Sequence, residues 1–174
     1  MVLNGMTAAK DKFILTKYKV SHVLTVTKTV LSKKHPGIVY KVLPLNDLPE
    51  ENIMSLFEEA HRFIDSATVC FVHCDAGVSR SPTIVISYLM YSERMSLKEA
   101  YMFVKERRKQ IAPNPGFVEQ LLEYEKVLFV SPQEDFLVDY FKIHYRINKF
   151  SDEQIAMALK ESNRDIAKAF ILLC

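Results

Sequence analysis

The chain has 174 residues, 49% of them hydrophobic and 25% charged, with a formal net charge of +2. This length and balance predict one globular domain, or one with a small second domain, and give no sign of a nucleic-acid-binding surface. The three cysteines, Cys70, Cys74 and Cys174, are too few for a disulfide framework, so we expect a reducing location, cytoplasmic or nuclear. We also expect no membrane span, signal peptide or N-terminal myristoyl group, because no long apolar run occurs and Val2 follows the first methionine.

The first part of the chain predicts helices that alternate with strands. Apolar residues at helical spacing predict a helix over 7–18, and alternating polar and apolar residues predict a strand over 21–26. Another strand is predicted over 38–43, after a connector that either attracts a phosphorylated partner or, as we favour, is a solvated loop. The side chains in question are Thr27, Lys28, Lys33, Lys34 and His35. The next predicted helix has an apolar face formed by Ile53, Phe57, Ala60 and Ile64.

The central part of the chain continues this alternation. A short β-branched run predicts a buried strand over 68–72, and an apolar helix pattern follows at 83–91. Two more helices are predicted over 97–110 and 115–129. Strands interleaved with helices predict an α/β fold with a central, mostly parallel sheet.

Between the strand at 68–72 and its helix lies a small, turn-prone run that carries a cysteine and an arginine. The run is His73-Cys74-Asp75-Ala76-Gly77-Val78-Ser79-Arg80-Ser81-Pro82. Unpaired N–H groups and the dipole at a helix N-terminus favour an anion and also stabilise a thiolate. We therefore expect Cys74 to be ionised and Arg80, with its planar fork, to hold two oxygens of a phosphate. Ala76 and Gly77 let backbone N–H groups turn toward the anion, and Ser81 can donate to the sulfur.

This run resembles the His-Cys-x-x-x-x-x-Arg-Ser signature of the cysteine-dependent dual-specificity protein phosphatases. The resemblance implies that Cys74 is the phosphate-accepting nucleophile, Arg80 the phosphate clamp and Ser81 the residue that assists cleavage of the thiophosphate. It also implies a phosphate-binding loop that is braced by His73 and consists of Asp75, Ala76, Gly77, Val78, Ser79 and Arg80. The alternative is a buried structural thiol beside a surface arginine. The phosphatase assignment requires that solvent reaches Cys74 and that Arg80 faces it across an oxyanion cradle.

Other segments resemble the same family, and together they cover about residues 1–130. They are Val2–Gly5, Ala8–Asp11, His22–Val26, Pro113–Phe117 and Gln120-Leu121. The resemblance implies a catalytic domain over 1–130, with a mostly parallel sheet of four to five strands flanked by helices and with no metal or other cofactor. Because the chain begins almost at Gly5, we expect an edge strand and part of the substrate-facing rim to be missing.

Dephosphorylation also needs a proton for the leaving oxygen, and a carboxylic acid on a loop that reaches the phosphate can supply it. Asp47 follows a predicted strand and Pro44, at the place where the family carries its general acid. An Asp that precedes a helix is otherwise an ordinary cap or turn residue. The resemblance favours the catalytic role, in which Asp47 later activates the attacking water.

Two close neighbours of Cys74 in the sequence need their own interpretation. Asp75 places a negative charge beside an anion site, so we expect its side chain to point away from the phosphate. Relatives that act on phosphoinositides tend to carry lysines in this loop, so Asp75 and Val78 argue against a lipid headgroup. Cys70 is either a small buried strand residue, which we favour, or the partner of Cys74 in a protective disulfide.

The end of the chain departs from a minimal phosphatase. After a linker predicted over 131–133, residues 134–174 predict three short helices, over 134–145, 152–161 and 165–173. This segment resembles a ubiquitin-associated domain (UBA-like) in its second and third helices. Such domains often bind ubiquitin through a Met-Gly-Phe or Met-Gly-Tyr loop, where this chain has Ile147-Asn148-Lys149-Phe150. The segment therefore either docks ubiquitin or another protein, or is a helical extension that stabilises the enzyme.

Taken together, these features predict a metal-independent protein phosphatase acting on phosphotyrosine and on phosphoserine or phosphothreonine through a cysteinyl-phosphate intermediate. The alternative is an adaptor or pseudophosphatase that docks phosphoproteins without turnover. The presence of Cys74, Arg80 and Asp47 together speaks against it, because a binder needs neither nucleophile nor acid. A phosphatase for RNA 5′ ends is disfavoured, since no extended basic and aromatic channel is evident.

Overall fold

The computed structural model describes residues 1–29, 33–129, 136–145 and 149–173. The chain divides into two compact units, Met1–Pro132 and Gln133–Cys174. The predicted linker 131–133, Ile147, Asn148 and Cys174 lie outside the described residues, so the predicted domain boundary stays a prediction. No helix within the described ranges is long and apolar enough to cross a membrane.

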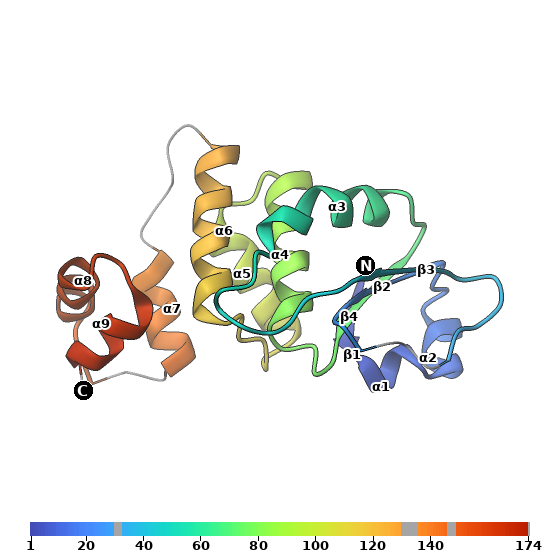
Figure 1. The fold of residues 1–174 in the computed structure, drawn as a ribbon, viewed down its shortest axis with the longest axis horizontal. Coiled ribbons are helices and arrows are strands. Elements are labelled where there is room, and N and C mark those ends of the chain that lie inside the picture. The colour runs from blue at the N-terminus through green and yellow to red at the C-terminus, as the bar shows by residue number, and fades with distance from the viewer. Residues whose placement is uncertain (30–32, 130–135, 146–148, 174) are drawn as a thin grey trace. The chain divides into compact units, whose positions relative to one another are not determined.

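In the part of the chain that the structure describes, the first unit is built on a parallel sheet with the strand order β1-β4-β2-β3 (Figure 1). Its strands are β1 (Val2–Gly5), β2 (His22–Val26), β3 (Val39–Leu43) and β4 (Cys70–Cys74). The predicted α/β fold with a central parallel sheet is therefore confirmed. The strand β4 lies between β1 and β2 and is buried along its whole length, as expected for an apolar strand in a parallel sheet covered on both faces.

Helices cover both faces of this sheet (Figure 1). Val23 and Phe71 pack with the residues of α1 (Met6–Ala9) and α2 (Lys12–Lys17) on one face. The next residues along their strands, Leu24 and Val72, are also fully buried and point to the opposite face, because side chains alternate along a strand. The elements of that face are the 3₁₀ helix η1 (Met54–Leu56), α3 (Phe57–Asp65) and α4 (Arg80–Ser92), with α5 (Leu97–Arg107) and α6 (Pro115–Leu128) packed against α4.

Several predicted boundaries differ from the structure; for example, the helix predicted over 97–110 ends at Arg107, and Ile53 precedes α3, which begins at Phe57. The helix predicted over 7–18 is two helices, because the Asp11 side chain caps the start of α2 by accepting a hydrogen bond from the Phe13 N–H at 2.8 Å. The strand predicted over 68–72 continues to Cys74, and the helix predicted to begin at Thr83 begins at Arg80. The proposed nucleophile is thus the last residue of a strand, and the proposed phosphate clamp is the first residue of a helix.

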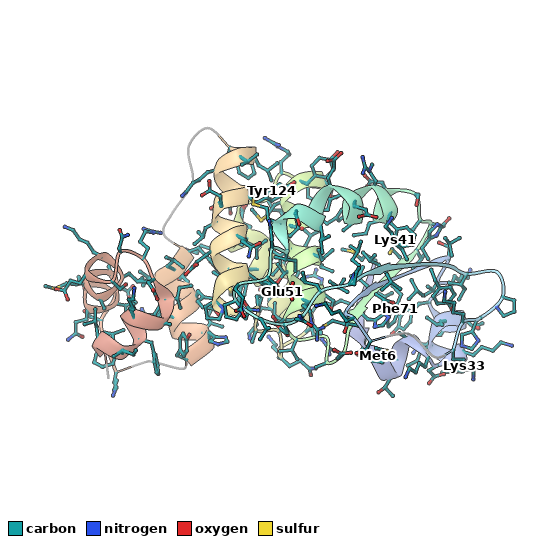
Figure 2. All side chains as sticks on the ribbon, in the orientation of Figure 1. Met6, Lys33, Lys41, Glu51, Phe71 and Tyr124 are labelled. Atoms are coloured by element: carbon teal, nitrogen blue, oxygen red, sulfur yellow. The ribbon has the colours of Figure 1, made fainter. Side chains whose placement is uncertain are left out.

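The helical layer of the first unit holds a buried histidine among aromatic rings. In Figure 2, Tyr124 lies on α6 and Phe71 lies in the sheet. His61 stacks on Tyr91, with ring centroids 5.1 Å apart, and its Nε2 lies 3.0 Å from the Ser87 hydroxyl. Burial lowers the pKa of His61 to about 4, although Asp65 opposes the shift. The ring is therefore neutral at physiological pH.

The second unit consists of α7 (Phe136–Tyr145), α8 (Asp152–Glu161) and α9 (Ile166–Leu173), close to the three predicted ranges. Ser151 and Gln154 form a capping box at the start of α8. The rings of Tyr145 and Phe170 stack at 4.5 Å and join α7 to α9. The buried side chains of this unit include Phe136, Leu137, Tyr140, Phe141, Ile155, Leu159, Ile166 and Ala169.

Candidate active site

The loop between β4 and α4 folds over the sulfur of Cys74. The Gly77 N–H donates to Cys74 Sγ at 3.3 Å, and the Ser81 hydroxyl donates to it at 3.2 Å. Cys74 is only 1% exposed, so the expectation that solvent reaches this side chain is wrong in this structure. That requirement of the phosphatase assignment is not met, and the assignment depends instead on the groups directed at the sulfur and on the resemblance to the family. The loop itself covers the sulfur, and a phosphoryl group must enter the loop to reach it. Ser81 lies where the predicted role requires it.

Gly77 allows the loop to turn where no other residue fits. Its backbone has a φ of +68°, in the left-handed region, and a Cβ at this position would lie 2.5 Å from the Asn4 carbonyl oxygen. The loop also contacts the start of α1, because the Met6 N–H donates to the Asp75 carbonyl oxygen at 2.9 Å. The loop is therefore packed directly against the backbone at the end of β1.

Arg108, just beyond α5, holds the outer side of the loop. Its Nε donates to the Gly77 carbonyl oxygen at 2.8 Å, its Nη2 to the Ala76 carbonyl oxygen at 3.0 Å and its Nη1 to Asn4 Oδ1 at 3.4 Å. With these carbonyl groups turned outward, the Gly77 N–H turns inward to the sulfur. Burial lowers the pKa of Arg108, and its attraction to Cys74 opposes that shift. Sequence reasoning missed this role, because cations are common at helix ends.

His73 lies behind the loop and is fully buried. Its Nε2 is 2.8 Å from the Thr25 hydroxyl, and its Nδ1 is 3.1 Å from the Cys74 carbonyl oxygen. Burial lowers the pKa of His73, and the contact with the Cys74 carbonyl opposes the shift. The structure thus places a neutral ring against the backbone of Cys74, which is the position that the predicted bracing role needs.

Arg80 lies at the mouth of the loop and contacts groups from two segments, the one after β3 and the loop itself. Its Nη1 donates to the Leu45 carbonyl oxygen at 3.1 Å, and its Nη2 donates to Asp75 Oδ2 at 2.7 Å. Its Nε lies 3.7 Å from Asp47 Oδ2 and has no hydrogen-bond partner among the described residues. A buried, charged N–H without a partner is costly, so this atom suits an incoming oxyanion.

The side chain of Asp75 does not point away from the phosphate site, so that expectation is wrong. Its carboxylate bonds Arg80, the predicted clamp, and accepts a second hydrogen bond from the Thr27 hydroxyl at 3.0 Å. Burial disfavours the ionised form of Asp75, but the hydrogen bonds from Arg80 and Thr27 outweigh it and hold the pKa of this carboxyl below its ordinary value. Side-chain direction within a loop leaves no signal in the sequence.

Asp47 lies beside the loop, as predicted, and two donors hold one of its oxygens. The Ser79 hydroxyl donates to Asp47 Oδ1 at 2.6 Å, and the Asn114 side chain donates to the same oxygen at 2.9 Å. The other oxygen, Oδ2, faces Arg80. Asn114 also caps α6, because its Oδ1 accepts from the Phe117 N–H at 3.0 Å. The start of α6 therefore positions the candidate acid, a function that sequence reasoning did not assign to Asn114.

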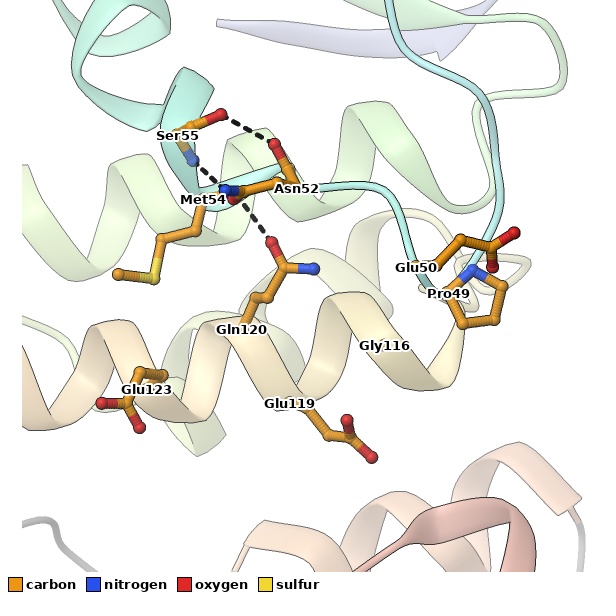
Figure 3. Close-up of a pocket in the computed structure, with 9 residues that line it drawn as sticks. All are labelled: Pro49, Glu50, Asn52, Met54, Ser55, Gly116, Glu119, Gln120 and Glu123. Atoms are coloured by element: carbon orange, nitrogen blue, oxygen red, sulfur yellow. Dashed lines mark hydrogen bonds between the residues drawn. The ribbon is translucent and has the colours of Figure 1, made fainter.

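The segment that carries Asp47 is fastened to α6 (Figure 3). The Gln120 side chain donates to the Glu51 carbonyl oxygen at 2.8 Å and accepts from the Met54 N–H at 2.9 Å. Gly116 lets the two backbones touch, because a Cβ there would overlap the Pro49 carbonyl group. A groove of about 560 Å³ runs along this contact. The aspartate-bearing segment is thus held by direct contacts to a helix.

Cys70 and Cys74 are the first and last residues of β4. Four steps along a strand separate their Cα atoms by about 13 Å, whereas a disulfide requires about 7 Å or less. Burial raises the pKa of Cys70 to about 12. The disulfide interpretation is therefore excluded by strand geometry, and Cys70 is a buried thiol. Within the described ranges, no group of three or more His, Cys, Asp or Glu side chains could hold a metal ion.

The parallel sheet and the loop that folds over the Cys74 sulfur define a class of protein, a phosphatase domain with a cysteine at the base of its loop. The particular family follows from comparison with family models. The model described as "Dual specificity phosphatase, catalytic domain" matches residues 2–127, and this chain belongs to that family. It therefore carries the catalytic domain of a hydrolase, a protein phosphatase. The match ends before α7, so the UBA-like assignment of the second unit stays a prediction.

Individual relatives agree with this assignment. The mouse "Dual specificity protein phosphatase 19" is 43% identical over 129 residues, which is 72% of this chain and 59% of the relative, so the chain spans less than two thirds of that protein. "Dual specificity protein phosphatase 1" of Arabidopsis thaliana is 39% identical, over 76% of this chain and 69% of the relative. The crystal structure of human DUSP28 is similar with a TM-score of 0.70 and 29% identity, covering 73% of this chain and 92% of that one.

Proposed function

We propose that this protein hydrolyses the phosphate monoesters of phosphotyrosine and of phosphoserine or phosphothreonine in proteins. The observation that carries the proposal is the sulfur of Cys74 at the base of the loop, with the Gly77 N–H and the Ser81 hydroxyl directed at it. The Nε of Arg80 at the mouth of the loop, which has no hydrogen-bond partner among the described residues, supports it. A binding module would need a cradle for phosphate, but it would have no use for a thiol beneath that cradle.

In the first step, Cys74 Sγ attacks as the thiolate and forms a bond to phosphorus while the bond from phosphorus to the leaving oxygen breaks. Asp47 donates its proton to that oxygen, so the product leaves as a neutral alcohol or phenol. Arg80 and the loop N–H groups stabilise the charge on the remaining phosphoryl oxygens. Ser79 and Asn114 hold Asp47 Oδ1, which leaves Oδ2, on the Arg80 side, as the oxygen that exchanges the proton.

In the second step, a water molecule attacks the phosphorus of the cysteinyl phosphate. Asp47, now ionised, takes a proton from that water, and the bond from phosphorus to sulfur breaks. The Ser81 hydroxyl, 3.2 Å from the sulfur, stabilises the thiolate as it departs. Inorganic phosphate leaves, and the enzyme returns to its starting state.

Turnover of phosphotyrosine and phosphothreonine peptides tests this mechanism. We expect the parent protein to release phosphate from both peptides, Cys74→Ser to release none, and Asp47→Asn to act about 100-fold more slowly. Cys70→Ser is the matched control, because it removes a buried thiol from the same strand and leaves the loop intact. Unimpaired activity of Cys74→Ser would contradict the mechanism. Peptide binding by the parent protein without any release of phosphate would favour the docking alternative.

We also propose that the second unit is a UBA-like protein-docking module that takes ubiquitin. Three large apolar side chains on α8 and α9 support this, since Met157 is 62% exposed, Ile171 73% and Leu172 55%. Replacing the three with serine in the full chain should abolish ubiquitin capture in a pull-down and leave phosphatase turnover unchanged. If the parent protein captures no ubiquitin, the proposal of a ubiquitin-docking module is contradicted. A fall in the Tm of the first unit on deletion of residues 134–174 would then support a stabilising extension.

For the location, we propose the cytoplasm or nucleus, because a cysteine nucleophile must stay reduced. Imaging of the tagged chain tests this, and accumulation in the secretory pathway would contradict it.

A further inference from the structure

Two carboxyl groups and one guanidinium line the mouth of the phosphate loop. The carboxyl groups of Asp75 and Asp47, 44% and 35% exposed, lie on either side of the buried Arg80 guanidinium. Asp75 is held in place by the hydroxyl of Thr27, a buried residue that follows β2, at 3.0 Å. The carboxylate at the mouth is therefore fixed in position and ionised.

Binding of a phosphoryl group changes what Asp75 faces. The Nε of Arg80 has no hydrogen-bond partner in the described part of the chain and can receive a phosphoryl oxygen, so that the charge of Arg80 is then shared between the incoming dianion and Asp75. Asp75 contacts the same guanidinium group as the phosphate would, so the two negative charges repel each other. At this range, at the partly screened surface of a protein, such a repulsion weakens substrate binding. A further cation beside Asp75 would offset the repulsion.

Among the described residues, two cations near the site contact other groups. Arg108 donates to the Gly77 and Ala76 carbonyl oxygens on the outer side of the loop. Lys28, close in sequence to Thr27, pairs with Glu51 at 3.8 Å. The compensating cation is thus best supplied by the substrate, and a residue adjacent to the phosphorylated one is close enough, because consecutive Cα atoms are about 3.8 Å apart.

On the basis of the proposed phosphatase function, we propose that Asp75 is a specificity-determining residue. It selects phosphorylated segments in which a lysine or arginine flanks the phosphorylated residue. Its carboxylate is kept ionised and in place by Thr27, so it recognises this cation while Arg80 holds the phosphate. The same carboxylate disfavours substrates that carry further negative charge beside the phosphate.

The test compares two phosphotyrosine peptides that differ only in the residues flanking the phosphotyrosine, lysine in one and glutamate in the other. We expect the parent protein to have about a tenfold higher kcat/KM for the lysine peptide, and Asp75→Asn to reduce this ratio to about twofold. Glu50→Gln is the matched control, because it removes one exposed carboxylate from the segment after Asp47, and its ratio should equal that of the parent protein. An unchanged ratio in Asp75→Asn would overturn the proposal.

A second variant separates charge from geometry. Thr27→Val removes the hydrogen bond to Asp75 but keeps the carboxylate. We expect its ratio of kcat/KM for the lysine peptide to kcat/KM for the glutamate peptide to stay within about threefold of the parent value. In both proteins this ratio should fall at high salt. Loss of the ratio in Thr27→Val at low salt would contradict a charge-based selection. If the parent protein hydrolyses neither peptide, the proposed phosphatase function fails. Calorimetric binding of the same peptides to Cys74→Ser, with and without Asp75→Asn, then tests the selection by itself.

Discussion

The outer side of the phosphate loop and its mouth each carry an arginine, and the two arginines have different partners. Arg108 donates to two backbone carbonyl oxygens and one side-chain amide oxygen, which are neutral. Arg80 is paired with the carboxylate of Asp75, and its Nε has no hydrogen-bond partner in the described ranges. That nitrogen can receive a phosphate oxygen while Asp75 keeps its hydrogen bond to Nη2. The outer side therefore fixes the shape of the loop, whereas the mouth leaves a donor for the substrate.

The largest expected effect separates the two arginines. Arg80→Lys replaces the fork with a point charge at the mouth, and we expect kcat/KM to fall about 10³-fold. Arg108→Lys keeps a cation on the outer side and should cost only about tenfold, through a less rigid loop. Steady-state kinetics on one phosphotyrosine peptide measures both. Equal losses would mean that the two sides do not differ in function.

Acidification should affect the buried neutral histidines before it affects the mouth. An unfolded histidine takes up a proton near pH 6.5, whereas burial lowers the pKa of folded His61 to about 4. The stability that His61 contributes is therefore complete above pH 6.5, falls as the pH falls, and is lost by about pH 4. This amounts to about 3 kcal/mol in the free energy of unfolding. His73 behind the loop, whose pKa is also lowered, acts in the same direction.

Urea unfolding between pH 7 and pH 4.5 measures how the free energy of unfolding depends on pH. His61→Gln should make this free energy less dependent on pH. Asp75→Asn should not, because the pKa of Asp75 lies below its ordinary value of 3.8, and its contribution is lost only at lower pH. A dependence that is unchanged in His61→Gln would show that another group takes up the proton.

A pair of glycines tests how tightly the outer side is packed. Gly77 and Gly37 both have positive φ, +68° and +79°, but a Cβ on Gly77 would meet the Asn4 backbone, whereas a Cβ on Gly37 would have open space. We expect Gly77→Ala to lower the free energy of unfolding by about 2 to 3 kcal/mol and Gly37→Ala by about 1 kcal/mol. Thermal or urea unfolding of the two variants compares them. Equal losses would mean that Asn4 moves away at no cost.

The smallest predicted effect concerns the support of the acid. Asn114→Ala removes one of the two donors to Asp47 Oδ1 and leaves the Ser79 hydroxyl in place. We expect kcat to fall about tenfold with KM little changed, because the proton donor is less well oriented. The same variant also loses the α6 cap, so Asn114→Asp, which keeps the cap, is the control for stability. A change confined to KM would contradict a positioning role.

The parts of the site that could be predicted lie close together in the sequence. Cys74, Arg80 and Ser81 share one strand, loop and helix, and their spacing carries their geometry. Asp47 could be placed only through the family resemblance, because an aspartate after a strand and a proline is otherwise an ordinary cap or turn residue. In the structure the segment after β3 reaches the loop after β4, although β2 lies between the two strands. The fold class followed from strands that alternate with helices.

The parts that could not be predicted depend on long-range contacts or on side-chain direction. Arg108 bonds a carbonyl 31 positions earlier, and Asn114 bonds an aspartate 67 positions earlier, and no local pattern indicates either contact. The direction of Asp75 depends on Thr27, which reaches it only in the folded sheet. The break between α1 and α2 was hidden because the apolar spacing continues across Asp11.

The attachment of the Asp47 segment to α6 has a consequence for the pace of the reaction. Glycine at position 116 lets the two backbones touch, and the Gln120 side chain forms hydrogen bonds to the backbone of Glu51 and of Met54. Asp47, the candidate acid, is therefore held beside the loop before any phosphorylated chain binds. We expect the rate of turnover to be set by the chemical steps and by exchange of substrate and product, with no dependence on closure of the Asp47 segment.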